Sequence, residues 1–317
     1  MTRATVTRLT HEADGVLGIE LRGADGQVLP AFTPGSHIDV NLPGGLRRSY
    51  SLVNDCRERD RYELGVGRAP ASRGGSSYLH EHLSVGDHLE VGVPRSLFGI
   101  DPAATEHVFV AGGIGITPIL SMIRWCEARS MPWRLLYCVR SQARAAYLWA
   151  LAPFCGRVTL HVDEEHLGRA ADFQAHLAAL PPGAHMYCCG PVAQMEVVAQ
   201  AVQDLALPAE SVHFERFGAT AAAHSSQDDK SFTVVLQRSG QRLVVEAGAS
   251  ILDVLERHGI ASPHACREGL CRSCELPLLG GEADHRDHVL SDQERSHQRT
   301  ILPCVSRALS DELVLDL

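Results

Sequence analysis

Four cysteines near the end of the chain constrain its fold more than any other feature. Cys266, Cys271, Cys274 and Cys304 follow the spacing C-x4-C-x2-C-x29-C. This is the plant-type pattern for a [2Fe-2S] cluster, in which three thiolates on one tight loop are joined by a fourth from a distant segment. The spacing therefore predicts a small domain built around a metal-binding loop, with these four side chains as the ligands.

A structural zinc site is the alternative for the same four cysteines. Zinc sites more often combine two short C-x2-4-C hairpins, and only one such pair occurs here. The late fourth cysteine and the strand pattern that follows the loop favour the cluster. Four other cysteines stand alone, and we expect each to be a small buried apolar residue; they are Cys56, Cys126, Cys138 and Cys155.

Composition excludes several classes of function. The formal net charge of −9 argues against a general nucleic-acid binder, which needs a basic face to displace counterions from phosphates. No apolar run approaches the roughly 18 residues that span a bilayer, so no membrane segment is expected. The first residues contain no apolar signal core, which makes the cytoplasm the expected compartment.

Local patterns divide the chain into three domains and a linker. Residues 1–102 contain short alternating strands separated by Gly and Pro, which predict an antiparallel β-barrel. Residues 103–218 alternate buried strands with helices, as in an α/β domain with a parallel sheet. Residues 219–230 are small and polar, as in a linker. Residues 231–317 begin with a β-hairpin pattern, continue through a helix and the cysteine loop, and end in a strand, as in an α+β domain.

A glycine-rich turn in the second domain is a candidate nucleotide site. Gly112, Gly113 and Gly115 lie between a buried strand and a helix that starts near Thr117. Glycines let the backbone approach a pyrophosphate, and the helix start offers free N–H groups to it. Such a turn alone is weak support, because many only pack tightly.

A second turn, Cys189-Gly190-Pro191, also joins a strand to a helix. Taken alone, it is most simply read as a strand–turn–helix with incidental cysteines. Its value as a candidate site depends on the glycine turn that accompanies it.

The first domain carries a candidate flavin segment. Arg48, Tyr50 and Ser51 lie on one strand, where Arg48 and Tyr50 face the same side. An aromatic ring beside a cation and a hydroxyl suits an isoalloxazine ring with an anionic tail. The alternative is an ordinary barrel strand.

Downstream of this strand, Gly74, Gly75 and Ser76 precede a short helix pattern and form a candidate phosphate cradle. The alternative is an ordinary surface loop.

Together these segments resemble the phthalate dioxygenase reductase family, which includes the vanillate demethylase reductases. The resemblance covers nearly the whole chain in order: R-x-Y-S-L at 48–52, G-G-S at 74–76, A-G-G-I-G-I-T-P at 111–118, Y-C-C-G-P at 187–191, H-F-E-R-F-G at 213–218, the cysteine loop, G-E-A-D-H-R-D at 281–287 and the final LVLDL.

The resemblance implies that the barrel binds FMN and that the middle domain binds NADH. It also implies that the last domain is an α+β ferredoxin-like (β-grasp) domain that holds the cluster. The residues it assigns to the flavin are Arg48, Tyr50, Ser51, Gly74, Gly75 and Ser76. Those it assigns to the nucleotide path are Gly112, Gly113, Gly115, Thr117, Cys189, Gly190 and Pro191. It places Thr117, Cys189 and Phe217 in the hydride-transfer region, with Phe217 packed against the flavin; we expect no acid–base pair, because the cofactors supply the chemistry.

The function that the resemblance implies is electron transfer from NAD(P)H through FMN and the cluster to a Rieske-type aromatic oxygenase. A reductase for a cytochrome P450 or another one-electron acceptor is an alternative. An alternative of another class is a zinc-bearing, nucleotide-binding interaction protein. We expect a monomer that binds a pyridine nucleotide.

Two positions depart from the family pattern. Arg272 follows the second cysteine of the loop, where relatives usually have glycine, so its backbone is expected to be strained, and its side chain either faces a docking partner or is a tolerated surface residue. Arg140, Ser141 and Arg144 follow the second strand of the middle domain, where a carboxylate usually accepts the ribose hydroxyls. The resemblance favours NADH, and these residues leave NADPH open.

Overall fold

The computed structural model describes residues 1–69, 72–218 and 229–317. Its internal contacts divide the chain into two units, Met1–Phe217 and Gly218–Leu317. Within the described parts of the chain, no helix is long and apolar enough to cross a membrane.

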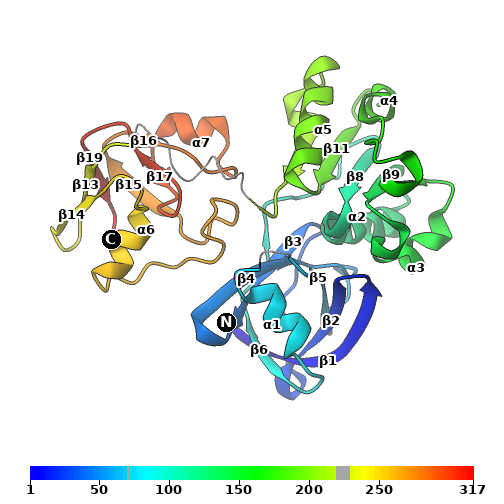
Figure 1. Ribbon diagram of the computed structural model, residues 1–317, viewed down its shortest axis with the longest axis horizontal. Helices are drawn as coiled ribbons and strands as arrows, with labels where there is room; N and C mark the ends of the chain where they lie inside the picture. The colour runs from blue at the N-terminus through cyan, green and yellow to red at the C-terminus, as the bar shows by residue number, and fades with distance from the viewer. Residues whose placement is uncertain (70–71, 219–228) are drawn as a thin grey trace. The chain divides into compact units, whose positions relative to one another are not determined.

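The first unit begins with an antiparallel sheet in the order β4-β3-β6-β1-β2-β5, with β7 paired to β3 (Figure 1). The strands are β1 Thr2–Ala13, β2 Val16–Gly23, β3 Ser36–Leu42, β4 Leu46–Ser51, β5 Arg61–Gly67, β6 His88–Val91 and β7 Arg95–Ser96. A bridge between Leu52 and Leu64 joins the end of β4 to β5, so the two edges of the sheet meet and it closes into a barrel. Helix α1, Gly75–Glu81, packs against β4 and β5.

The same unit continues with a fully parallel sheet in the order β10-β9-β8-β11-β12. Its strands are β8 His107–Gly112, β9 Trp133–Val139, β10 Val158–Val162, β11 His185–Cys189 and β12 Val212–Glu215. The chain starts at β8, adds β9 and β10 on one side, and then crosses to β11 and β12 on the other. The strand order therefore reverses between β8 and β11, which is where open α/β sheets bind their ligands.

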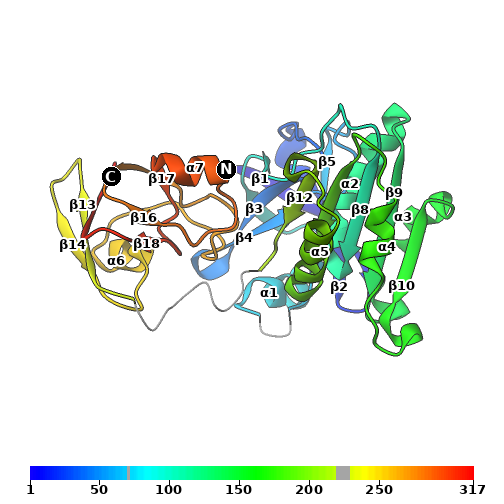
Figure 2. The ribbon, with the colours of Figure 1, turned by 90° about the horizontal axis from the view of Figure 1, so that it is seen from above.

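Helices cover both faces of this parallel sheet (Figure 2). They are α2 Ile116–Arg129, α3 Leu148–Leu151, α4 Phe173–Ala178 and α5 Val192–Asp204. On one face, Ile119 and Ile123 of α2 join the core that contains Phe109 of β8. On the other face, Met195 of α5 joins the core that contains Val110. Burial on both faces explains why the three central strands, β8, β9 and β11, are almost continuously buried.

The barrel and the parallel sheet share a hydrophobic core. Val53 and Phe98, from the barrel segment, belong to the cluster of buried residues that contains α2. Ser121 of α2 donates a hydrogen bond to the Asn54 carbonyl at 3.0 Å, and Arg124 of α2 donates one to the Val53 carbonyl at 3.0 Å. The two expected domains are therefore packed together as one unit.

The second unit contains a mixed sheet in the order β14-β13-β19-β15-β17 and a small two-stranded sheet of β16 and β18. Its strands are β13 Phe232–Leu236, β14 Arg242–Val245, β15 Leu276–Gly280, β16 Ala283–Asp284, β17 Thr300–Ile301, β18 Arg307–Ala308 and β19 Glu312–Leu315, and its helices are α6 Ile251–Arg257 and α7 Asp292–His297. The first two strands form the expected hairpin, and the final strand pairs in parallel with β13. Ile251, Val254 and Leu255 of α6 pack against the sheet. Of the linker expected at 219–230, residues 219–228 lie outside the described residues.

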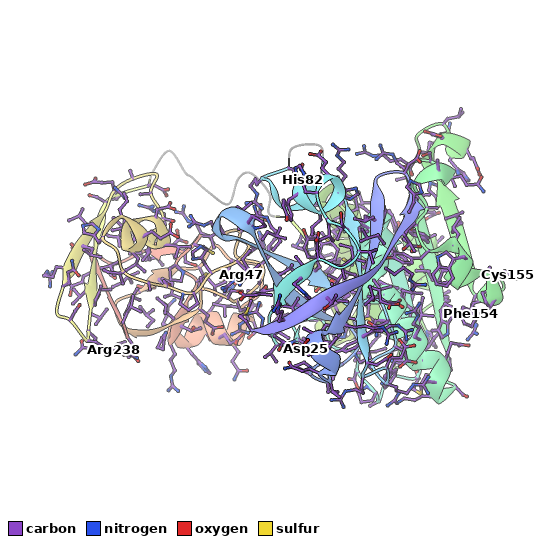
Figure 3. All side chains as sticks on the ribbon, turned by 90° about the horizontal axis from the view of Figure 1, so that it is seen from below. Asp25, Arg47, His82, Phe154, Cys155 and Arg238 are labelled. Atoms are coloured by element: carbon purple, nitrogen blue, oxygen red, sulfur yellow. The ribbon has the colours of Figure 1, made fainter. Side chains whose placement is uncertain are left out.

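The four lone cysteines differ in burial. Cys126 and Cys138 are buried, as expected, and Cys56 is half-buried. The expectation is wrong for Cys155, which is exposed (Figure 3). It lies in the loop between a short turn, Ala152–Phe154, and β10, and not on the apolar face of a helix or strand.

Candidate functional site

The glycine turn after β8 and the turn after β11 meet where the strand order reverses. A Cβ atom placed on Gly115 would lie 2.1 Å from the Cys189 carbonyl oxygen and 2.8 Å from the Gly190 nitrogen. One on Gly112 would lie 2.6 Å from Cδ of Pro191. The structure thus brings two segments expected to bind nucleotide, 74 residues apart by the numbers of Gly115 and Cys189, into direct contact. Side chains are excluded at both glycines, and this allows the two turns to pack directly on each other.

Thr117 lies where this edge approaches the barrel. Its hydroxyl donates to the Ile114 carbonyl at 2.9 Å, and the residue is buried. A Cβ atom on Gly65 of β5 would lie 2.6 Å from Cγ2 of Thr117 and 2.6 Å from the Tyr147 hydroxyl. The missing side chain at Gly65 therefore allows the barrel strand to reach the start of α2.

The expected flavin residues gather between β4 and α1. A Cβ atom on Gly75 would lie 2.6 Å from Cγ of Arg48, so the arginine packs on the glycine. The Arg48 guanidinium donates to the Arg73 carbonyl at 2.8 Å, which orients it along the loop. Gly74 has a φ of 91°, a backbone conformation that favours glycine. The cation and the candidate phosphate loop are therefore adjacent.

Tyr50 and Ser76 complete this region. Burial raises the pKa of Tyr50 to about 12, so its hydroxyl stays protonated and can serve as a hydrogen-bond donor. The Ser76 hydroxyl donates to the Ser72 hydroxyl at 3.0 Å and accepts from the Ala69 N–H at 3.3 Å. These polar groups, together with the cation of Arg48, suit a phosphate-bearing ligand.

Glu215 is a candidate that the sequence patterns did not single out. The Ser51 hydroxyl, on the barrel, donates to its carboxylate at 3.4 Å, and Cys189 is its register partner across the β11–β12 ladder. The residue keeps some accessible surface, but protein atoms surround its carboxyl group, and this burial raises its pKa to about 8. The sequence feature that could have identified Glu215 is its position as a carboxylate at the end of a strand, within the H-F-E-R-F-G segment.

The two remaining residues of the expected hydride-transfer region differ in exposure. Cys189 is fully buried, and burial raises the pKa of its thiol well above the usual value, so it stays neutral. Phe217 is 43% exposed and lies two positions beyond Glu215. Its ring is therefore accessible to a bound aromatic group.

In the second unit, the four loop cysteines form two pairs. The thiol of Cys266 donates to Cys271, which lowers the pKa of Cys271, and the thiol of Cys274 lies 3.3 Å from that of Cys304. Two pairs of thiols suit two irons, because a [2Fe-2S] cluster takes four cysteine ligands shared between its two metals.

Backbone amides also point at these sulfurs. The Sγ atom of Cys266 accepts N–H groups from Glu268 at 3.3 Å and from Leu270 at 3.5 Å. The amide of Gly269, whose φ is 68°, interacts with the Cys304 thiol. Amide donors around thiolates stabilise their negative charge and tune the metal that they bind.

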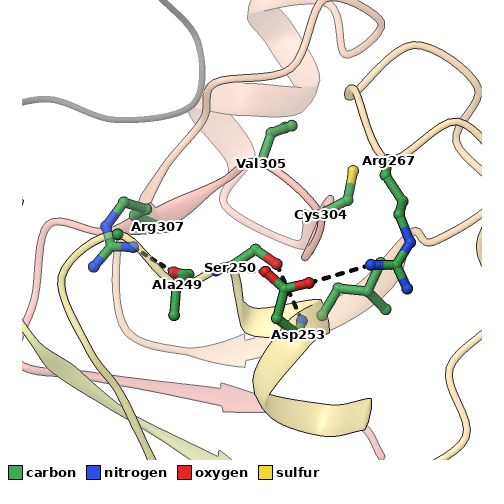
Figure 4. Close-up of a pocket in the computed structure, with 9 residues that line it drawn as sticks. Ala249, Ser250, Asp253, Arg267, Cys304, Val305 and Arg307 are labelled. Carbon is green, nitrogen blue, oxygen red and sulfur yellow. Dashed lines mark hydrogen bonds and ion pairs between the residues drawn. The ribbon is translucent and has the colours of Figure 1, made fainter. Parts of the chain in front are cut away.

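A small cavity opens beside Cys304 (Figure 4). Ser250 and Asp253 at the start of α6 line one side, and Arg267 of the cysteine loop lines another. Arg267 donates to Asp253 at 3.2 Å across the cavity. The Cys304 residue therefore lies beside a polar cavity that is lined by two charged, partly exposed side chains, Asp253 and Arg267.

Comparison with known proteins agrees with this geometry. The family described as "2Fe-2S iron-sulfur cluster binding domain" matches residues 234–309. Phenoxybenzoate dioxygenase subunit beta of Ectopseudomonas oleovorans is 45% identical over 98% of this chain and 95% of its own.

Two solved structures extend the likeness to the whole fold. One is an intact type IV self-sufficient cytochrome P450 monooxygenase, with a TM-score of 0.89 and 37% identity over all of this chain, which spans 41% of that longer protein. The other is phthalate dioxygenase reductase, described as a modular structure for electron transfer from pyridine nucleotides to [2Fe-2S], with a TM-score of 0.75 and 40% identity over 99% of this chain and 97% of its own. Because the second match combines this identity with nearly full coverage of both chains, the protein belongs to the phthalate dioxygenase reductase family of flavin- and iron–sulfur-dependent oxidoreductases.

Proposed function

We propose that this protein is the reductase component of a Rieske-type aromatic oxygenase and moves electrons from NADH through FMN and a [2Fe-2S] cluster to its partner. The paired cysteines carry this proposal, because two thiol pairs on a family-matched loop suit a one-electron centre. The glycine-lined edge supports the other half of the proposal, a nucleotide site beside a flavin site, because Glu215 next to Cys189 on this edge accepts a hydrogen bond from Ser51 of the barrel.

Each group of residues has a proposed ligand. The FMN residues are Arg48, Tyr50, Ser51, Gly74, Gly75 and Ser76; the nucleotide residues are Gly112, Gly113, Gly115, Thr117, Cys189, Gly190 and Pro191; and the cluster ligands are Cys266, Cys271, Cys274 and Cys304. Phe217 covers the flavin ring. The proposed domains are 1–102, 103–218 and 231–317.

When bound, the flavin accepts a hydride from the nucleotide, and the cluster passes electrons on one at a time. The protein itself positions the flavin and the nucleotide and shields them from water. Arg48 and Gly75 hold the phosphate, whereas Gly112 and Gly115 allow the turns after β8 and β11 to pack together at the proposed nucleotide site. Glu215, with its raised pKa, is protonated at neutral pH and so adds no negative charge beside an anionic cofactor.

A spectrum and a metal analysis test the proposal. We expect purified protein to contain one flavin, iron and acid-labile sulfide, and to reduce cytochrome c with NADH. NADPH should act more weakly, despite Arg140 and Arg144. A preparation that holds zinc and no flavin would instead support the zinc-bearing interaction protein and would rule out the reductase.

The likeness to a self-sufficient cytochrome P450 supports a second candidate, a reductase for a haem monooxygenase. Plant-type clusters lie near about −400 mV and Rieske centres higher, so transfer to a Rieske partner is downhill. Reconstitution with a Rieske oxygenase and, in parallel, with a P450 decides between them. The faster turnover at equal acceptor concentration identifies the partner class.

The setting that we propose is a monomer in the cytoplasm. The −9 formal charge keeps single copies apart by repulsion. Light scattering of the flavin-loaded protein at several concentrations measures the mass directly, and a concentration-independent mass near 34.4 kDa is the expected result.

A further inference from the structure

Two arginines in the cysteine loop share an unusual arrangement. Arg267 and Arg272 each follow directly after a cysteine, Cys266 and Cys271. Both have a positive φ, 61° and 55°, in the left-handed region that disfavours residues with a side chain. A non-glycine residue keeps such a conformation only where its surroundings hold it there.

The first arginine is held by α6. Arg267 donates to Asp253 at 3.2 Å and also contacts Glu256, one turn further along that helix. Its side chain is 40% exposed, so this pair of contacts is partly screened by water.

The second arginine is held more tightly and by different elements. Arg272 contacts both oxygens of Glu275 in a two-point pair, at 2.7 and 3.0 Å, and also contacts Glu294 of α7 at 2.6 Å. Its side chain is 24% exposed. Two-point pairs between a guanidinium and a carboxylate fix orientation as well as adding attraction.

Each of these carboxylates has a second structural task. Glu275 accepts a hydrogen bond from the Thr300 hydroxyl at 2.8 Å, on β17, the strand that leads to Cys304. Glu294 completes the capping box of α7 by accepting from the Ser291 N–H at 2.8 Å. Arg272 therefore links the segment after Cys271 to the segment that delivers the fourth cysteine.

The guanidinium of Arg272 lowers the pKa of both glutamates that it contacts. The hydrogen bond from Arg272 lowers the pKa of Glu294 to about 2, with the capping N–H of Ser291 as the next cause. The same guanidinium lowers the pKa of Glu275. All three groups are thus charged at neutral pH, and the arginine side chain is not free at the surface.

We propose that Arg272 is a positioning residue that clamps the two ligand-bearing segments together and adds a positive charge beside the cluster. The clamp slows loss of the cluster, and the charge raises its reduction potential. This inference rests on the proposed function, since it requires the cluster to be bound by the four cysteines.

Two substitutions separate the clamp from a merely structural role. Arg272→Gln removes the positive partner, and Glu294→Gln removes a negative partner while its amide oxygen can still cap α7. Arg238→Gln is the matched control, because Arg238 forms an exposed two-point pair with Asp316 elsewhere in the same unit. All variants are measured as the full flavin- and cluster-loaded protein.

The first readout is the rate at which a chelator bleaches the visible absorbance of the cluster. We expect Arg272→Gln and Glu294→Gln each to bleach about tenfold faster than the unchanged protein, as losing a partly buried charged pair implies. The double variant should bleach no faster than the faster single one, because both remove the same link. Arg238→Gln should bleach at the original rate.

The second readout is the reduction potential of the cluster, from a spectroelectrochemical titration. Arg272→Gln should shift it to a more negative value, and Glu294→Gln to a more positive one. General loosening of the fold would not produce shifts of opposite sign in two variants that lose the cluster equally fast.

Arg272→Gly tests whether strain or the clamp dominates. Glycine adopts a φ of 55° without cost but cannot bind either glutamate. Bleaching as fast as in Arg272→Gln supports the clamp, and bleaching slower than in the unchanged protein overturns it. If Arg272→Gln had the same bleaching rate and the same reduction potential as the original protein, the clamp would be overturned but the reductase function would stand. If the original protein bound no cluster, both the clamp and the reductase function would be overturned.

Discussion

The two regions proposed to hold cofactors in this protein are built in opposite ways. The edge proposed to bind the nucleotide is defined by missing side chains: Gly112 and Gly115 pack so closely on the turn after β11 that any Cβ atom would overlap it. The cysteine loop is defined by added side chains, with four thiols for the metal and charged residues that hold the loop in place. The first region should therefore fail when atoms are added, and the second when they are removed.

Among substitutions that remove a side-chain group from the cysteine loop, Cys304→Ser should have the largest effect on activity. The serine hydroxyl is a poor substitute for a thiolate on iron, so cytochrome c reduction by NADH should be abolished while NADH still bleaches the flavin. Cys155→Ser is the matched control, because that thiol is exposed and lies in the first unit. Cytochrome c reduction that persisted in Cys304→Ser would mean that the flavin reaches this acceptor directly.

Gly115→Ala is the corresponding test of adding an atom to the glycine-lined edge. The new Cβ atom would lie 2.1 Å from a backbone oxygen, and overpacking of this kind costs about 1–3 kcal/mol. We expect the apparent affinity for NADH, measured by stopped-flow bleaching, to fall by about tenfold or more. Gly156→Ala has open space around it and should change nothing. Equal losses in the two variants would contradict the packing argument.

Glu215→Gln refines the comparison, because it changes charge without changing shape. The carboxyl has a pKa of about 8 in the folded protein against an ordinary 4.5, so it is neutral at pH 7 and ionised at pH 9. Affinity for the anionic nucleotide should therefore weaken in the unchanged protein as pH rises through 8, and stay constant in the variant.

The two proteins should bind NADH alike at pH 6–7, where glutamine imitates the protonated acid. Folding stability follows the same sign: a raised carboxyl pKa contributes stability that is lost as pH rises from about 4.5 to 8. Urea titrations at pH 5 and pH 9 should show a larger fall for the unchanged protein than for Glu215→Gln. Parallel falls would show that another group is responsible.

Features written in local sequence were predictable. The cysteine spacing, the strand–glycine–helix turn at 107–129 and the hairpin after residue 231 depend on neighbours along the chain, and the structure has all three. Alternating apolar and polar residues and frequent turns in the first 100 residues correctly indicated an antiparallel sheet. The expected strain at Arg272 is confirmed by its positive φ.

Contacts between distant segments were not predictable in the same way. Ser51 and Glu215 are 164 positions apart, so their hydrogen bond depends on how the barrel packs on the parallel sheet. The partners of Arg272 lie on α7 and at Glu275, and choosing between a docking role and a surface role required their positions. Cys155 was misjudged because hydrophobic character alone does not show that a loop is covered.

The hydrophobic core common to the barrel and α2 has a consequence for the evolution and engineering of such proteins. Ser121 and Arg124 bind backbone carbonyls of the barrel, so a foreign barrel would have to offer matching acceptors and matching apolar shape. Exchange of modules is therefore expected after Phe217, where the first unit ends, and not between flavin and nucleotide segments. We therefore expect residues 1–217, proposed to accept the hydride, to be exchanged between proteins as one piece, and the unit with the four loop cysteines to be exchanged separately.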